Sequence, residues 1–323
     1  MIAFYLSLAL AQPLVSRAID YDPLRVDKSQ VVKTIDLRLH DSKRDRDVPV
    51  LFYLPSGEKA APVVFFSHGL GGSRTGNEFL GTHLAKRGYV AVFLQHPGSD
   101  ESVWRSVPLR DRLSSMKKAA SAQNFSLRIA DVSFVIDELT KLNGDPGRGV
   151  AGRMDLKRIG MSGHSFGAVT TEAVSGQNFP GVGQSLTDPR IKAAIMYSPS
   201  TPKSADPAKA FGSVKLPWLL MTGTEDQSPI NDTDVANRLS VYPGLPTGDK
   251  FELVLENAEH SAFTDRALPG DREPRNPNHH RAILGISTAF WDTYLRQDKA
   301  AGKWLNGDGP KSILEPKDRW QKK

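Results

Sequence analysis

The 323-residue chain contains no cysteine. A thiol nucleophile, thiolate zinc ligands and cysteine-held iron–sulfur clusters are therefore excluded, so any catalysis must use oxygen or nitrogen chemistry. The chain also has no apolar run near the ~20 residues of a transmembrane helix. Its composition, 39% hydrophobic and 24% charged, permits a large core and excludes a disordered, collagenous or disulfide-stapled protein.

Charge of one sign is concentrated in a single short stretch. The chain has 42 Lys and Arg against 36 Asp and Glu, a net charge of +6. Residues 105–118 hold five of these cations and one aspartate. A nucleic-acid binder would show a basic stripe interleaved with aromatic residues or a reading motif, and neither is present. We interpret the basicity as solvated surface and expect no nucleic-acid partner.

The amino terminus carries a short apolar segment. Residues 2–11 (IAFYLSLALA) are uncharged and too few to span a bilayer. Ala9-Leu10-Ala11 is typical of a cleavage site with small residues, which predicts a secretory signal peptide over 1–11 and a secreted or periplasmic protein. The segment lacks the usual Lys or Arg, which leaves open an ordinary buried segment, a misassigned start and a cytoplasmic location.

Apolar runs and helical segments alternate along the chain. Strands are predicted at 31–39, 48–54, 63–67, 89–94, 158–161, 193–197, 218–221 and 251–255. Helices are predicted over 77–87 and 121–142, and after Ser165, Asn231 and Pro277. This alternation indicates an α/β fold with a mostly parallel sheet and helices on both faces.

The domain organisation is simple. A charged turn between the first two strands predicts an antiparallel hairpin at a sheet edge. Residues 95–120 are polar and irregular, and no loop has the apolar periodicity of a large lid. Neither a repeat nor a Pro/Ser linker divides the chain. We therefore expect one domain over 30–302 and a basic tail over 303–323.

The strongest chemical signal is Gly163-His164-Ser165-Phe166-Gly167, between the strand RIGM and the helix-compatible AVTTEAV. This strand-turn-helix context is what a G-x-S-x-G nucleophile elbow requires. Glycines flank the serine because a side chain would clash in so sharp a turn. The turn would raise the Ser165 hydroxyl to the carboxyl edge of the sheet, at a helix N-terminus. The alternative is a plain turn in which Ser165 caps a helix.

A serine hydroxyl becomes nucleophilic when a base accepts its proton. In an α/β hydrolase the chain order is nucleophile, acid, histidine, so the base must follow the last predicted strand. Of the eight histidines, His260, His279 and His280 lie far enough along, and His260 follows the strand FELVL through the short loop ENAEH. We assign His260 as the base and interpret the other two as polar residues that open the last helix.

The acid is expected after the penultimate strand, WLLM, in the loop TGTEDQSP. Asp226 is the favoured residue, because a carboxylate there can hold the far nitrogen of His260 and stabilise the imidazolium. Glu225, Asp232 and Asp234 are the rivals. The last two fit better near a helix N-terminus, and Glu225 as a solvated neighbour.

A tetrahedral intermediate also needs donors aimed at its oxyanion. One is expected to be the backbone N–H of Phe166, the residue after the nucleophile. The other is expected to be the N–H of Leu70, in the glycine-rich loop SHGLGG over 67–72. His68 is interpreted as a structural residue that holds this loop.

These motifs resemble a known family. The order Ser165, Asp226, His260 is similar to the α/β-hydrolase superfamily, and FSHGLGGSR, HPGSD and GHSFGA resemble the branch of predicted dienelactone hydrolases, chlorophyllase-like proteins, bacterial polyester hydrolases and platelet-activating-factor acetylhydrolases. The resemblance covers about residues 30–300 and implies the α/β-hydrolase fold. Dienelactone hydrolases proper use a cysteine, and secreted polyester hydrolases commonly carry disulfides, so the absence of cysteine implies a serine carboxylesterase.

The sequence thus predicts a serine carboxylic-ester hydrolase that forms an acyl-enzyme on Ser165. An acyltransferase or amidase with the same triad, or a non-catalytic binding protein on this scaffold, are the alternatives. We expect no cofactor and no metal, because His279 and His280 with nearby acids match no ligand spacing. The expected partner is a small-molecule, lipid or polymer ester, and the expected oligomeric state is a monomer.

Apolar residues of several loops are candidates for the substrate pocket. Trp104, Phe179 and Phe263, with Leu70 and Phe166, would line an apolar acyl site, although each is equally compatible with core packing. Because no large lid is predicted, the site should be open. An open site favours short-chain or surface-accessible esters.

Overall fold

The computed structural model describes residues 21–323 except 180–185, 204, 229, 232 and 269. The predicted signal segment, residues 1–11, lies outside the described part of the chain. None of the described helices combines the length and the apolar character needed to cross a membrane.

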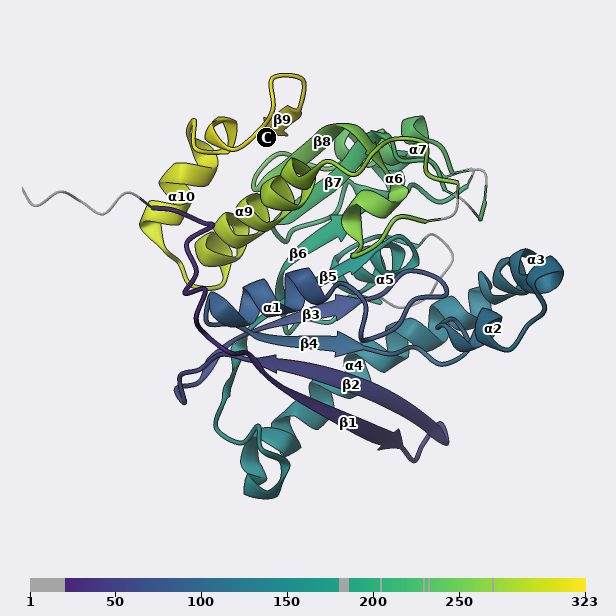
Figure 1. The fold of residues 1–323 in the computed structure, drawn as a ribbon, viewed down its shortest axis with the longest axis vertical. Helices are drawn as coiled ribbons and strands as arrows, with labels where there is room; N and C mark the ends of the chain where they lie inside the picture. Colours follow the sequence, from purple (N-terminus) through teal and green to yellow (C-terminus); the bar gives the residue numbers. More distant parts are fainter. Residues whose placement is uncertain (1–20, 180–185, 204, 229, 232, 269) are drawn as a thin grey trace, which may run out of the picture.

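The centre of the fold is a twisted sheet. Within the described residues its nine strands lie in the order β1-β2-β4-β3-β5-β6-β7-β8-β9 (Figure 1). The strands are β1 (Lys33–Asp41), β2 (Arg46–Leu54), β3 (Ala61–Ser67), β4 (Val90–Leu94), β5 (Met154–His164), β6 (Ile191–Tyr197), β7 (Trp218–Glu225), β8 (Lys250–Glu259) and β9 (Arg319–Lys322). Strands β4, β3, β5, β6, β7 and β8 are parallel, whereas β1–β2, β2–β4 and β8–β9 pair antiparallel. The predicted mostly parallel sheet with an antiparallel edge hairpin is confirmed.

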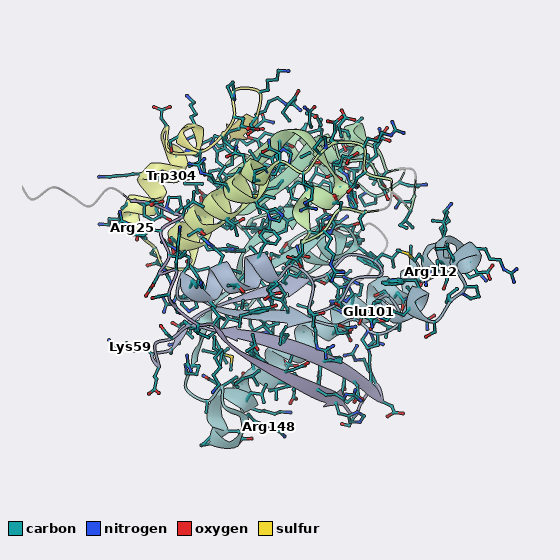
Figure 2. The ribbon with its side chains drawn as sticks, viewed as in Figure 1. Arg25, Lys59, Glu101, Arg112, Arg148 and Trp304 are labelled. Carbon is teal, nitrogen blue, oxygen red and sulfur yellow. The ribbon has the colours of Figure 1, made fainter. Side chains whose placement is uncertain are left out.

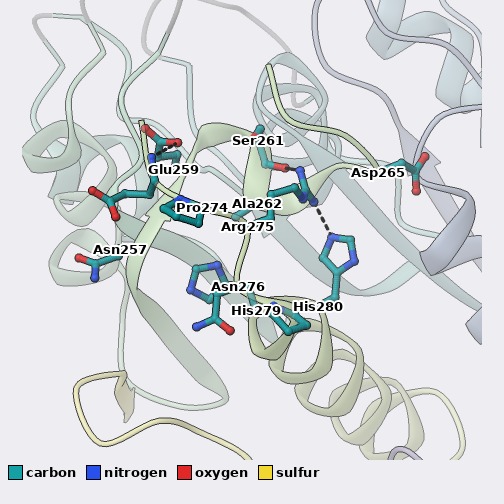
Figure 3. A pocket seen from close by; sticks show the side chains of 12 residues that line it. Asn257, Glu259, Ser261, Ala262, Asp265, Pro274, Arg275, Asn276, His279 and His280 are labelled. Carbon is teal, nitrogen blue, oxygen red and sulfur yellow. Dashed lines mark hydrogen bonds between the residues drawn. The ribbon is translucent and has the colours of Figure 1, made fainter. Parts of the chain in front are cut away.

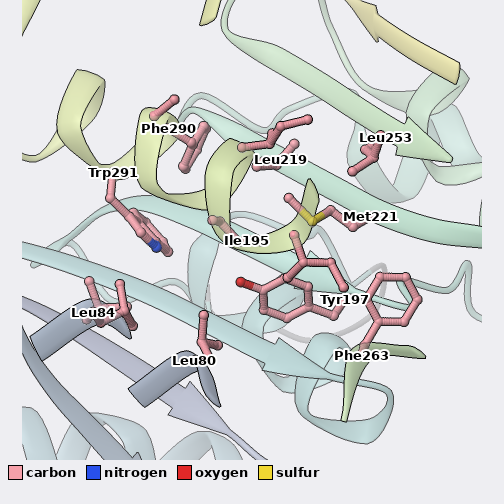
Figure 4. Close-up of a cluster of buried hydrophobic side chains, with 14 of the residues drawn as sticks. Leu80, Leu84, Ile195, Tyr197, Leu219, Met221, Leu253, Phe263, Phe290 and Trp291 are labelled. Atoms are coloured by element: carbon pink, nitrogen blue, oxygen red, sulfur yellow. The ribbon is translucent and has the colours of Figure 1, made fainter. Parts of the chain in front are cut away.

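Helices cover both faces of the sheet. They are α1 (Glu78–Lys86), α2 (Ser102–Arg105), α3 (Leu109–Ala119), α4 (Ala122–Gly144), α5 (Phe166–Ser175), α6 (Pro207–Phe211), α7 (Val235–Leu239), α8 (Val241–Gly244), α9 (Pro277–Tyr294) and α10 (Lys299–Asn306), with short 3-10 turns η1 (Pro146–Arg148), η2 (His260–Phe263) and η3 (Pro310–Ser312). Side chains alternate between the two faces along each strand. Val64 and Phe66 therefore pack in the core under α1 and α9, whereas Val63 and Phe65 pack under α4. Figure 4 shows part of the first cluster, with Trp291 of α9 over the sheet.

Two elements differ from the sequence expectation. Residues 95–120, predicted to be irregular, contain α2 and α3, which project from the body of the molecule (Figure 1). Leu109 is 81% and Leu113 51% exposed, so both leucines of α3 face solvent and do not follow a core stripe. The segment 303–323, predicted to be a tail, contains β9, which pairs with β8. Trp320 of β9 stacks on Phe251 of β8, with their ring centroids 5.7 Å apart. A four-residue polar strand leaves no readable period in the sequence.

Candidate active site

Ser165 lies at the junction of β5 and α5, at the carboxyl edge of the sheet. Its backbone has φ 56° and ψ −115°, a region that non-glycine residues rarely adopt. Ser165 is partly exposed, whereas its neighbour His164 is buried. Strained backbone that persists at a solvent-accessible serine is typical of functional sites.

The flanking glycines make this turn possible. A Cβ on Gly167 would lie 1.8 Å from the carbonyl oxygen of Ser67, and a Cβ on Gly163 would lie 2.2 Å from the carbonyl oxygen of Gly167. Both contacts are far inside van der Waals distance, so neither position accepts a side chain without movement of the backbone. The close approach of backbone to backbone that the motif predicts is present.

Asp226 and His260 lie together beside this turn. Asp226 follows β7, His260 follows β8, and these neighbouring parallel strands bring their carboxyl ends to one edge of the sheet. His260 Nδ1 is 2.7 Å from Asp226 Oδ1, and Asp226 Oδ2 accepts a hydrogen bond from Thr222 Oγ1 at 2.8 Å. We assign the Nδ1 proton of His260 to its hydrogen bond with the ionised carboxylate, which leaves Nε2 as the basic nitrogen.

Ser165 approaches His260 through its neighbour His164. Among the described residues, no hydrogen bond joins Ser165 Oγ to His260 Nε2. His164, next to Ser165, nevertheless lies against His260: its Nε2 is 3.1 Å from the His260 carbonyl oxygen, and the two ring centroids are 4.6 Å apart. Bonds between nucleophile and base often tighten only in the substrate complex, and the structure places the two residues on adjacent segments.

Arg238 of α7 also contacts Asp226, and the sequence did not predict this neighbour. Its Nε lies 3.0 Å from Asp226 Oδ1 and donates to the Asp226 carbonyl oxygen at 2.6 Å. Its Nη1 donates to the Ser198 carbonyl oxygen at 2.9 Å. Burial alone would raise the pKa of Asp226, but Arg238 and then His260 outweigh it and hold the pKa well below its usual range. No motif surrounds Arg238, so no sequence signal indicated it.

The glycine-rich loop after β3 lies against the elbow. A Cβ on Gly69 would lie 3.4 Å from Ser165 Cβ, so the loop passes directly beside the serine. Gly71 N–H donates to the Ser99 carbonyl at 2.9 Å and Gly72 N–H to the Gly69 carbonyl at 3.0 Å. Within the described residues, the N–H groups of Leu70 and Phe166 donate no hydrogen bond, which leaves both free for another acceptor.

His68 is held inside this loop. It is 2% exposed, its Nε2 accepts from the His96 backbone N–H at 3.1 Å, and its Nδ1 then donates to the Gly69 carbonyl at 2.7 Å. Burial, and next the charge of Arg128, lowers the pKa of His68 well below its ordinary value. These contacts agree with the structural role expected from the sequence.

The three residues predicted to line an acyl pocket lie in different surroundings. Trp104 donates from Nε1 to the carbonyl of Gly71 in the glycine-rich loop at 2.7 Å. Its ring centroid lies 5.4 Å from the guanidinium carbon of Arg112, which is labelled in Figure 2 on the projecting α3. Phe263 is 1% exposed and packs near Tyr197, so it offers almost no surface to a substrate. Phe179 packs against Phe125 on the α4 side of the sheet, with their ring centroids 5.6 Å apart.

A cavity of about 290 Å³ lies beside the loop that follows His260 (Figure 3). Its lining includes Ser261, Arg275, His279 and His280, but not Ser165. His279 Nε2 is 3.0 Å from the Glu256 carbonyl oxygen, and His280 stacks on Phe79 at 3.8 Å. Within the described part of the chain, no group of three or more His, Cys, Asp or Glu side chains is placed to hold a metal ion.

Two comparisons with known proteins bear on the family resemblance and on the fold. Residues 30–140 match the family described as "Platelet-activating factor acetylhydrolase, isoform II". The structure is similar to that of a ferulic acid esterase from Streptomyces cinnamoneus, with a TM-score of 0.61 and 22% sequence identity over 90% of this chain and 96% of that one. The family match confirms the predicted resemblance to the acetylhydrolase branch over residues 30–140, and the structural similarity confirms the predicted fold.

Proposed function

We propose that this α/β hydrolase cleaves carboxylic esters through an acyl-enzyme on Ser165. The observation that carries the proposal is the 2.7 Å contact between His260 Nδ1 and Asp226 Oδ1, beside a strained serine at the same sheet edge. The matched family and the similar structure are both named for ester-hydrolysing enzymes, which supports the predicted class of ester-bond hydrolase.

In the proposed mechanism, Nε2 of His260 accepts the proton of Ser165 as Oγ attacks the ester carbonyl. The tetrahedral intermediate collapses when His260 returns that proton to the departing alcohol, which leaves an acyl-enzyme. Water, deprotonated by the same nitrogen, then attacks the acyl carbon, releases the acid and restores Ser165. Asp226 fixes the tautomer of His260 and stabilises the imidazolium in both halves of the reaction.

The oxyanion of each tetrahedral intermediate needs donors. The N–H groups of Leu70 and Phe166 are the proposed pair, which is supported by their lack of a described hydrogen-bond acceptor and by the contact of Gly69 with Ser165. Losing one such donor typically costs ~10²–10³ in rate. Because both donors are backbone N–H groups, substitutions other than proline act on them only by moving the backbone.

Short-chain or surface-accessible esters are the proposed substrates. The residues at the rim of the site support this proposal. Trp104 contacts the glycine-rich loop and Arg112 of α3. The projecting α3 exposes Leu109 and Leu113 and also carries four cations, Arg110, Arg112, Lys117 and Lys118. A helix with an exposed apolar stripe flanked by cations is suited to lie on a lipid or polymer surface. Export of the protein remains a proposal from residues 1–11.

Labelling with a fluorophosphonate probe, followed by peptide mass spectrometry, tests the nucleophile. The proposal predicts one stoichiometric adduct on Ser165, and no adduct after prior reaction with a serine-directed inhibitor. An unlabelled protein would favour a non-catalytic binding role. Product analysis with added alcohols and amines then separates the hydrolase from an acyltransferase, and amide substrates separate it from an amidase.

A further inference from the structure

A second Ser–His–Asp chain lies in the core beneath the glycine-rich loop. Ser67 Oγ is 2.7 Å from His96 Nε2, and His96 Nδ1 is 3.0 Å from Asp131 Oδ2. All three side chains are 0% exposed. No substrate can reach this serine, so the arrangement cannot act as a second catalytic triad.

The surrounding hydrogen bonds determine which atoms donate and which accept in this Ser–His–Asp group. Asp131 accepts from Arg46 Nε and from Arg44 Nη1, both at 2.8 Å, and from His96 Nδ1. The neutral His96 therefore offers Nε2 as an acceptor for the Ser67 hydroxyl. Burial lowers the pKa of His96 to about 4, which keeps the ring neutral. The lone pairs of Ser67 Oγ are thus left for a donor on the other side.

That donor is Arg128 of α4. Its Nη2 donates to Ser67 Oγ at 3.1 Å and, more closely, to the His68 carbonyl. Its Nε donates to Thr170 Oγ1 of α5 at 3.0 Å, and its guanidinium carbon lies 4.7 Å from the ring centroid of Phe166. One buried side chain therefore contacts both the start of the glycine-rich loop and the residue after Ser165.

Arg128 has an unusual electrostatic environment. It is 0% exposed, yet in the described part of the chain its guanidinium forms no ion pair with a carboxylate. Its hydrogen-bond acceptors are neutral oxygens. Burial lowers its pKa to about 9, so the group is still cationic near neutral pH. The charges of Asp131 and Asp100 offset part of the cost of burial. A buried cation without a directly paired carboxylate is still costly to the fold, and packing alone gives no reason for it.

We propose that Arg128 is a positioning residue, which fixes residues 67–72 against the elbow so that the N–H groups of Leu70 and Phe166 converge on the oxyanion. Ser67, His96 and Asp131 orient the guanidinium. This inference rests on the proposed ester hydrolysis at Ser165. A lysine at position 128 would keep the positive charge. Its ammonium group could not reproduce the planar guanidinium, which contacts several oxygens at once.

The test compares Arg128→Lys and Ser67→Ala with wild type on p-nitrophenyl acetate. We expect kcat to fall about 10–100-fold, because a misplaced donor loses part of the ~10²–10³ that an oxyanion donor supplies, with KM changed less than twofold. The double variant should be no slower than Arg128→Lys alone, because both changes act on one contact. If Arg128→Lys does not fold, the kcat of Ser67→Ala alone decides the test.

Tyr89→Phe is the matched control for lost stability. Tyr89 is also 0% exposed, and it donates a buried hydrogen bond to Asp292 at 2.6 Å, on the face of the sheet under α1 and α9. It should lower the melting temperature without lowering kcat. A loss of kcat in the two test variants no greater than in Tyr89→Phe, or a change confined to KM, would overturn the proposal. Inactive wild-type protein would instead refute the ester hydrolysis itself.

Discussion

Arg238 Nε lies 3.0 Å from Asp226 Oδ1, the same oxygen that is 2.7 Å from His260 Nδ1. Asp226 is 0% and Arg238 2% exposed. The proposed catalytic acid therefore shares one oxygen between the proposed base and a buried cation. The arginine keeps the carboxylate ionised in a place where burial would otherwise favour its protonated form.

Arg238→Met should lower the stability of the protein and change its dependence on pH. Breaking a buried pair by removing one partner typically costs about 3–5 kcal/mol. The depressed pKa of Asp226 stabilises the folded protein above the pKa of the unfolded carboxyl, and this contribution is lost as pH falls. Because the pKa of Asp226 would rise without the cation, the unfolding free energy of Arg238→Met should fall less steeply below about pH 4 than that of wild type. Denaturant unfolding over this pH range checks both outcomes, with the exposed Arg266→Met as control. An equal slope in wild type and Arg238→Met would show that Arg238 does not act on Asp226.

Gly167→Ala should prevent the elbow from forming. The added Cβ would lie 1.8 Å from the Ser67 carbonyl oxygen, so the backbone must move and the serine with it. We expect loss of activity and a large fall in melting temperature. Gly144→Ala, at the exposed end of α4 with nothing within 4 Å of the new Cβ, should be neutral or stabilise the protein by up to about 1 kcal/mol. An active Gly167→Ala protein would refute this account of the turn.

Glu172 of α5 gives a pH dependence of stability. It is 0% exposed, and burial raises its pKa to about 8 from 4.5. Between these values the unfolded chain has lost the proton that the folded protein retains, so stability falls as pH rises, by up to about 1.4 kcal/mol per pH unit. Glu172→Gln should remove this decline.

Unfolding free energies at pH 5.5 and pH 7.5 measure the effect of Glu172. The advantage of Glu172→Gln over wild type should be larger at the higher pH. Glu58→Gln, at an exposed position, should track wild type at both. An equal difference at the two pH values would mean that Glu172 is ionised in the folded protein.

The exposed leucines of α3 should matter only for substrates at an interface. Replacing Leu109 and Leu113 together by serine should leave turnover of soluble p-nitrophenyl acetate unchanged. Turnover of an emulsified ester or a polyester film should fall several-fold, because burial of a leucine side chain contributes about 1.5–3 kcal/mol. Val31→Ser, at a residue 88% exposed, is the control. Equal turnover of the film by wild type, the double leucine variant and Val31→Ser would show that α3 has no role in substrate selection.

The fold was predictable because parallel strands are buried on both faces and appear as uninterrupted apolar runs, such as VVFFS and YVAVFL. The elbow was predictable because backbone crowding demands glycine at two fixed positions. Arg128 and Arg238 were not predictable, since arginine is usually exposed and nothing local shows that these two are buried. Their roles depend on elements distant in the sequence, α4 against β3 and α7 against β7 and β8.

The helix α3 was missed for a different reason. Leu109 and Leu113 have helical spacing and form a narrow exposed stripe, but most residues around them are polar or charged. The segment therefore lacks the wide apolar face of a core-packed helix. The same reasoning explains Phe263. An aromatic residue just after the proposed base is compatible with a pocket wall, and only packing against Tyr197 decides that it belongs to the core.

Steady-state hydrolysis of p-nitrophenyl acetate and butyrate by wild type and Ser165→Ala tests the central claim most directly. The exposed Ser106→Ala variant serves as the control. We predict that Ser165→Ala lowers kcat by at least about 10³, as loss of an activated nucleophile does elsewhere, while the melting temperature is kept and Ser106→Ala matches wild type. Turnover that survives in Ser165→Ala would contradict the account.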